Sequence, residues 1–135
     1  MKIIIICYIT FMLQIIIHEG AHYIVAKVYN WQIMNITIGD KDLSIKLGIL
    51  NFSFYPIGGC VEVKIISDNK DVFKKLLFYS AGNIASILFC IIGYTFLNDS
   101  LIKLILLIIT GATVLNNILP KPFKSDLALF LEAIK

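Results

Sequence analysis

Three long apolar segments dominate the chain, and a stretch of alternating apolar and polar residues separates the first from the second. The apolar segments are residues 3–29, 72–97 and 101–119. Each is close to or above the length of about 20 residues that crosses the hydrocarbon core of a bilayer. None of them contains proline, and charged residues are few. The pattern therefore predicts three transmembrane helices, followed by a C-terminal tail over residues 120–135.

Residues 31–66 change to a period of two. Apolar and polar residues alternate along four short runs, at residues 34–38, 43–47, 50–54 and 61–65. This alternation predicts three or four short strands in a small sheet at the membrane surface. The expected fold class is an α-helical integral membrane protein of one domain, residues 1–135, with a small β-sheet inserted between its first two helices.

The composition supports this assignment. The chain has 135 residues, of which 59% are hydrophobic. Its mean hydropathy is +0.87, whereas ordinary globular domains are roughly half apolar. All 12 basic residues are lysine, which argues against a nucleic-acid partner, because arginine makes most bidentate contacts to bases. The bias toward Lys and Ile is typical of an AT-rich bacterial genome, so we expect a multi-pass protein of the bacterial cytoplasmic membrane.

Lysines are distributed unevenly around the predicted connections. Many lie in or near the segment between the first and second helices, and the connection between the second and third helices has none. The positive-inside rule therefore places the sheet, the end of the first helix and the C-terminus on the cytoplasmic side. These lysines are Lys27, Lys41, Lys46, Lys64, Lys70, Lys74 and Lys75.

The first apolar segment carries the sequence His18-Glu19-Gly20-Ala21-His22, an H-E-x-x-H pattern. Residues four apart lie on one face of a helix, about one turn from each other. Both imidazoles can therefore bind one metal ion, with Glu19 beside them as a general base. Ionisable groups at membrane depth are costly, so their presence indicates a functional site.

Two further features concern the helices around this motif. Gln14 precedes His18 by four residues and is expected either near the metal or in an interhelical hydrogen bond. The second helix contains small residues that allow another helix to approach closely. They are Ser80, Ala81, Gly82, Ala85 and Ser86.

A catalytic zinc site needs a third protein ligand, and without a third histidine this ligand should be a carboxylate. Glu19 is reserved as the base, and Asp99 is expected on the opposite side of the membrane. Asp126 lies just after the third helix, on the side of the histidines. The other candidates that remain open are Asp40, Asp42, Glu62, Asp68, Asp71 and Glu132.

Three short motifs follow the histidine motif along the chain. They are Pro56-x-Gly58-Gly59 after a strand region, Ala81-Gly82 in the second helix, and Asn117-x-x-Pro120 ahead of Asp126. In this order the motifs resemble the site-2 protease family of intramembrane metalloproteases, over nearly the whole chain. The resemblance implies that His18, His22 and Asp126 bind one Zn²⁺ ion. It also implies that Glu19 is the catalytic base.

The leading hypothesis is a zinc-dependent intramembrane endopeptidase that cleaves a single-span membrane protein or a membrane-bound peptide. Asn117 is expected to hydrogen-bond the substrate backbone or the oxyanion, or else to make a helix-end hydrogen bond. Gly58 and Gly59 are expected to help bind an unwound substrate, which pairs with an exposed strand edge within residues 43–66.

Two rival functions remain open. Asp126 is followed by Leu127, where the family usually has glycine, and this motivates a metal-binding pseudoprotease that binds partner helices without cleaving them. The second rival is a small membrane interaction protein that binds no metal. Zinc content separates this second rival from the others, and cleavage that depends on Glu19 separates a protease from a pseudoprotease.

Overall fold

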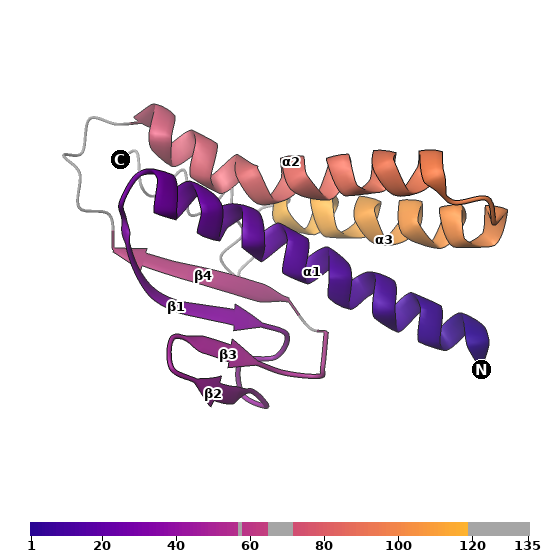
Figure 1. Ribbon diagram of the computed structural model, residues 1–135, viewed down its shortest axis with the longest axis horizontal. Coiled ribbons are helices and arrows are strands. Elements are labelled where there is room, and N and C mark those ends of the chain that lie inside the picture. The colour runs from indigo at the N-terminus through magenta and orange to yellow at the C-terminus, as the bar shows by residue number, and fades with distance from the viewer. Residues whose placement is uncertain (57, 65–71, 119–135) are drawn as a thin grey trace.

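The computed structural model describes residues 1–56, 58–64 and 72–118, which form three long helices and one small sheet (Figure 1). The helices are α1 (Lys2–Val28), α2 (Val72–Phe96) and α3 (Ser100–Ile118). The predicted ends of all three helices agree with the observed ends to within one residue. The predicted tail, residues 120–135, lies outside the described residues.

α2 turns back into α3 through a short connection that begins at Leu97. The side chain of Asp99 caps α3, because its Oδ1 accepts hydrogen bonds from the backbone N–H groups of Leu101 at 2.8 Å and Ile102 at 3.2 Å. α2 therefore runs antiparallel to α3, and α3 runs in the same direction as α1 (Figure 1). Gly93 allows close packing here, since an added Cβ would collide with Leu106 of α3.

All three helices are long and apolar enough to cross a membrane. In the most apolar stretch of each helix, only 22%, 22% and 17% of the residues are buried within the protein. The outer surface of the bundle is therefore covered with large apolar side chains, far more than a soluble monomer exposes. Such a surface fits a membrane protein.

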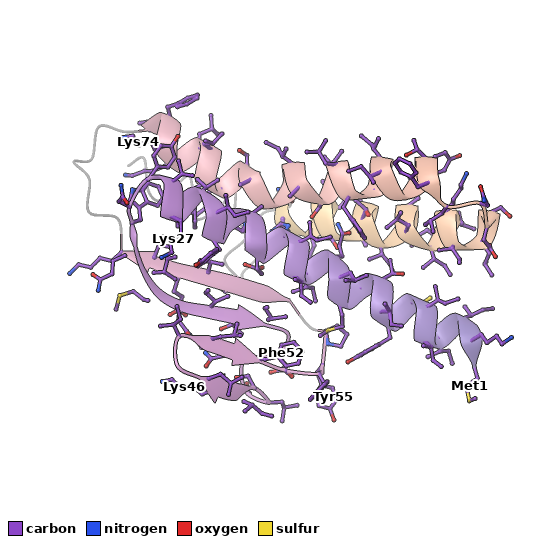
Figure 2. The ribbon with its side chains drawn as sticks, viewed as in Figure 1. Met1, Lys27, Lys46, Phe52, Tyr55 and Lys74 are labelled. Atoms are coloured by element: carbon purple, nitrogen blue, oxygen red, sulfur yellow. The ribbon has the colours of Figure 1, made fainter. Side chains whose placement is uncertain are left out.

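Lysine and tyrosine side chains pair near both ends of the bundle. Lys27 lies 5.9 Å from the ring centre of Tyr23, and Lys74 lies 5.6 Å from that of Tyr29. Both lysines lie at the end of the bundle opposite Met1 (Figure 2). At the other end Lys103 lies 4.8 Å from the ring centre of Tyr94. Tyrosines and lysines at helix ends are typical anchors at a membrane–water interface.

The sheet contains four strands in the order β2-β3-β1-β4. β1 pairs in parallel with β3 and antiparallel with β4, and β2 pairs antiparallel with β3. The predicted small sheet is therefore present, as a mixed sheet. The strands are β1 (Gln32–Ile38), β2 (Ile45–Leu47), β3 (Leu50–Phe52) and β4 (Gly59–Lys64).

The sheet lies alongside α1, with β4 as the strand that runs closest to the helix (Figure 1). The hydroxyl group of Tyr8, near the start of α1, donates a hydrogen bond of 2.6 Å to the carbonyl oxygen of Phe54. The segment that follows β3 therefore contacts the N-terminal part of α1.

A small aromatic core fixes the end of α1 against β1 and α2. Ala26, Trp31 and Phe78 are buried together, and Ile33 and Val63 of the sheet pack against them. Trp31 lies in the short connection between α1 and β1. Its burial in this core therefore fixes the position of the last turns of α1. These turns follow directly after the histidine motif.

Candidate metal centre

The two motif histidines face each other across one turn of α1. Their side chains are buried, at 4% exposure for His18 and 3% for His22. Their Nε2 atoms lie 3.3 Å apart. Two Nε2 atoms that each lie 2.0–2.1 Å from a tetrahedral zinc ion would be separated by about 3.3 Å. The observed spacing therefore fits one zinc ion held by both rings.

The other nitrogen of each ring is held by α2. Nδ1 of His22 lies 2.7 Å from the carbonyl oxygen of Phe78, and Nδ1 of His18 lies 3.2 Å from Oγ of Ser86. A carbonyl oxygen can only accept, so His22 carries its proton on Nδ1 and leaves the Nε2 lone pair for a metal. Hydrogen bonds of this kind orient the ligating histidines of zinc sites.

α2 approaches the histidines most closely at Gly82. A Cβ atom at this position would lie 2.5 Å from Nε2 of both His18 and His22. The absence of a side chain therefore keeps the space in front of both nitrogen atoms open. Phe78, Gly82 and Ser86 are spaced by four residues, so one face of α2 meets both histidines.

Glu19 is directed toward the sheet. Its side chain is 7% exposed, and a Cβ atom on Gly59 would lie 2.6 Å from its Oε1. Gly59 therefore allows the first residue of β4 to pack directly on the carboxylate. Gly58 has a φ of +80°, and a Cβ atom there would meet nothing within 4 Å. Of the two glycines predicted to bind substrate, Gly59 contacts the motif and Gly58 shapes the backbone before it.

Asn117 closes the site from α3. Its Nδ2 atom lies 3.2 Å from Nε2 of His18 and 3.5 Å from Oδ1 of Asn83 on α2. The side chain therefore connects all three helices at the histidine pair. Its predicted role in substrate or oxyanion binding stays a prediction, but the structure places its amide within hydrogen-bond distance of Nε2 of His18.

Asp126, the third ligand that the resemblance implies, lies outside the described residues, so this assignment stays a prediction. Within residues 1–56, 58–64 and 72–118, no group of three His, Cys, Asp or Glu side chains could hold a metal ion. Glu62, one of the other candidates, forms an ion pair with Lys41 at 3.0 Å. A hydrogen bond and the attraction of this carboxylate raise the pKa of Lys41.

Gln14 is fully buried, one turn before His18. Neither its Nε2 nor its Oε1 atom has a hydrogen-bond partner among the described residues. The alternative that Gln14 forms an interhelical hydrogen bond is therefore wrong for this part of the chain. Thr110 of α3 is also buried, and its hydroxyl oxygen likewise has no partner in the described part.

The contacts of Gly82 and Ser86 with the histidines were not predicted from the sequence. Both residues were expected to allow close helix packing, and Gly82 also belongs to the Ala81-Gly82 motif of the family resemblance. A signal was present, because Gly82 and Ser86 have the same spacing of four residues as His18 and His22. α2 is apolar on all sides, however, so the hydrophobic pattern does not indicate which face meets α1.

Comparison with models of known protein families gives a match over most of the chain. The model of a family described as "Peptidase family M50" matches residues 6–131, which is nearly the whole chain. The matched segment contains the histidine motif, Gly59, Gly82, Asn117 and Asp126. No curated protein and no solved structure matches the chain.

Proposed function

Because the chain belongs to peptidase family M50, a family of zinc metalloproteases, we propose that it is a zinc-dependent intramembrane endopeptidase. Its substrate would be a single-span membrane protein or a membrane-bound peptide, cleaved within or near the bilayer. The observation that carries this proposal is the histidine pair. Two buried Nε2 atoms lie 3.3 Å apart, with the Glu19 carboxylate on the same helix.

When bound by His18, His22 and Asp126, zinc would lower the pKa of a water molecule to about 7 and polarise the scissile carbonyl group. Glu19 would remove a proton from this water as its oxygen attacks the carbonyl carbon. It would then pass the proton to the amine nitrogen as the carbon–nitrogen bond breaks. Burial of Glu19 limits competition from bulk water for this proton.

Asn117 would act on the substrate at the same step. Negative charge develops on the carbonyl oxygen during attack, and a fixed amide N–H group stabilises it most in surroundings that exclude water. The contact of Asn117 with Nε2 of His18 puts an amide donor at the metal-binding end of this ring. The contact with Asn83 helps to hold the side chain in place.

β4 offers a binding edge for an unwound substrate. It is an outer strand of the sheet, and its first residue, Gly59, packs on Glu19. A helix must unwind before cleavage, and its released backbone N–H and C=O groups are costly in apolar surroundings. Pairing with the free edge of β4 would satisfy these groups and lead the substrate past Glu19. Gly58 would keep the entrance to this edge free of side chains.

The site would lie near the cytoplasmic face of a bacterial membrane. Three apolar helices and the lysine–tyrosine pairs at the bundle ends support a multi-pass membrane protein. Lysines concentrated around the sheet support the cytoplasmic side for the end of α1 that follows the histidines. Membership in a peptidase family favours a protease over an inactive protein that only binds partner helices.

The metal assignment is tested by zinc content. Purified protein is expected to contain one zinc ion per chain, and Asp126→Ala is expected to lose most of it, because a two-histidine site lacks its third ligand. Inductively coupled plasma mass spectrometry measures the occupancy. Asp99→Ala, a carboxylate removed at the opposite end of α3, is the matched control and should keep its zinc. Full occupancy in Asp126→Ala would exclude Asp126 as the third ligand.

The contact between Gly59 and Glu19 gives a separate prediction. Gly59→Ala is expected to lower kcat about 10²-fold, because the new methyl group displaces the base from its position. Zinc content should not change, since Gly59 does not contact the histidine nitrogens. Gly20→Ala is the control, because its Cβ meets nothing within 4 Å. A Gly59→Ala enzyme with normal kcat would show that the base tolerates displacement.

A further inference from the structure

A second buried polar layer, formed by Gln14 and Thr110, lies between one and two helical turns from the histidine pair. Gln14 on α1 is 0% exposed and Thr110 on α3 is 5% exposed. Three of their polar atoms, Nε2 and Oε1 of Gln14 and Oγ1 of Thr110, have no hydrogen-bond partner within the described residues. Buried polar groups are almost always paired in proteins, so this layer requires an explanation.

The helix register places both residues on the same side of the candidate metal centre. His18 contacts Asn117, and α1 and α3 run in the same direction (Figure 1). Gln14 precedes His18 by about 6 Å along α1, and Thr110 precedes Asn117 by about 10 Å along α3. Both therefore lie toward the α2–α3 connection, with only about 4 Å between them along the helix axes.

These unpaired atoms make the observed packing around Gln14 and Thr110 costly. A buried amide or hydroxyl that has given up water without gaining a partner destabilises the packed arrangement. An unwound substrate also has unpaired polar groups, because its backbone N–H and C=O groups have lost their helical hydrogen bonds in apolar surroundings. Pairing the two sets of groups would remove both penalties at once.

We propose that Gln14, together with Thr110, binds the peptide backbone of the unwound substrate beside the scissile bond. The side-chain amide of Gln14 carries both donors and an acceptor, as a peptide group does, so it can pair with N–H and C=O together. An extended chain advances about 3.3 Å per residue. The offset of about 6 Å from His18 therefore places this contact about two residues from the cleaved bond.

This inference rests on the proposed protease function, and the experiment distinguishes the two. The probe is a fluorescently labelled single-span peptide of leucine and alanine with a central Gly-Gly pair, reconstituted with the full chain in nanodiscs. Gln14→Leu is expected to raise KM about tenfold, because the substrate loses about one hydrogen bond to the enzyme. It should leave zinc content unchanged. Its thermal unfolding midpoint should be equal to or above that of the wild type, because leucine removes an unpaired amide.

Thr110→Val is expected to act in the same direction, and Thr113→Val is its matched control. The hydroxyl group of Thr113 already donates to the carbonyl oxygen of Ile109 at 2.9 Å, so its loss should leave KM unchanged. An ester bond in place of the peptide bond two residues from the cleavage site should raise the KM of the wild type but not that of Gln14→Leu.

Two results would overturn the inference while leaving the protease intact. They are an unchanged KM in Gln14→Leu, and a lowered unfolding midpoint that accounts for the whole loss of activity. A zinc-loaded wild-type protein that leaves the peptide uncut would instead count against the proposed function and, with it, this inference. A rise in KM with retained zinc and retained stability supports the backbone contact, because a purely structural role predicts the opposite stability change.

Discussion

Gly82→Ala is expected to weaken zinc binding by about 100-fold or more and to lower cleavage with it. The added methyl group would lie 2.5 Å from Nε2 of His18 and of His22, so both ligands must move or α2 must shift away. Disturbing the groups that orient metal ligands costs about 10–100-fold in metal affinity, and a direct collision with both ligands should reach or exceed the upper end of this range. Zinc titration with a competing chelator measures the affinity.

Two controls separate a local collision at the histidines from unfolding of α2. Alanine stabilises a helix interior by about 1 kcal/mol relative to glycine, so α2 should not unfold. Circular dichroism should therefore show full helix content in Gly82→Ala. Gly111→Ala on α3, where a Cβ meets nothing within 4 Å, should keep zinc and activity. Tight zinc binding by Gly82→Ala would show that the histidines do not bind the metal in the observed arrangement.

Glu19→Gln is expected to lower kcat by about 10²–10⁴-fold, the usual contribution of a general base. Glutamine has nearly the same shape and cannot accept the proton of the attacking water at neutral pH. Zinc should remain bound, because Glu19 is directed toward Gly59 and does not form part of the histidine pair. Single-turnover cleavage of a single-span substrate, with zinc content measured on the same sample, gives both values.

Glu62→Gln is a suitable comparison for Glu19→Gln. Glu62 lies on the exposed face of the sheet in an ion pair with Lys41, so its loss should change kcat little. Loss of zinc in Glu19→Gln would show that Glu19 is a ligand, and retained kcat would remove it as the base. The inactive variant also offers a way to identify natural substrates, since bound single-span proteins can be isolated with it from the native membrane.

The helices could be predicted closely from the sequence because each is one long, nearly uninterrupted run of apolar residues with polar or charged residues at its ends. The strands were also found from their alternation. Their order was not, because a period of two defines which faces a strand has but not which strand lies beside it. The parallel pairing of β1 with β3 is therefore a result of the structure alone.

The proximity of the two motif histidines could also be predicted from local sequence alone. Its spacing along one helix is sufficient to bring His18 and His22 together. The contributions of Gly82, Gly59 and Asn117 depend instead on how three helices and a sheet pack around α1. Gln14 shows the limit most clearly, because sequence reasoning offered two roles for it and the structure excludes the interhelical hydrogen bond within the described residues.

The aromatic core at the end of α1 gives the protein an internal optical reporter. Trp31 is the one tryptophan of the chain, so its fluorescence arises from a single place. Its ring centre lies 5.4 Å from that of Phe78, which lies 5.0 Å from that of His22. Only the ring of Phe78 thus lies between the indole of Trp31 and the imidazole of His22, a proposed zinc ligand. Occupation of the site by a quenching ion such as Co²⁺ or Cu²⁺ can therefore be followed in real time, in lipid and without any added label.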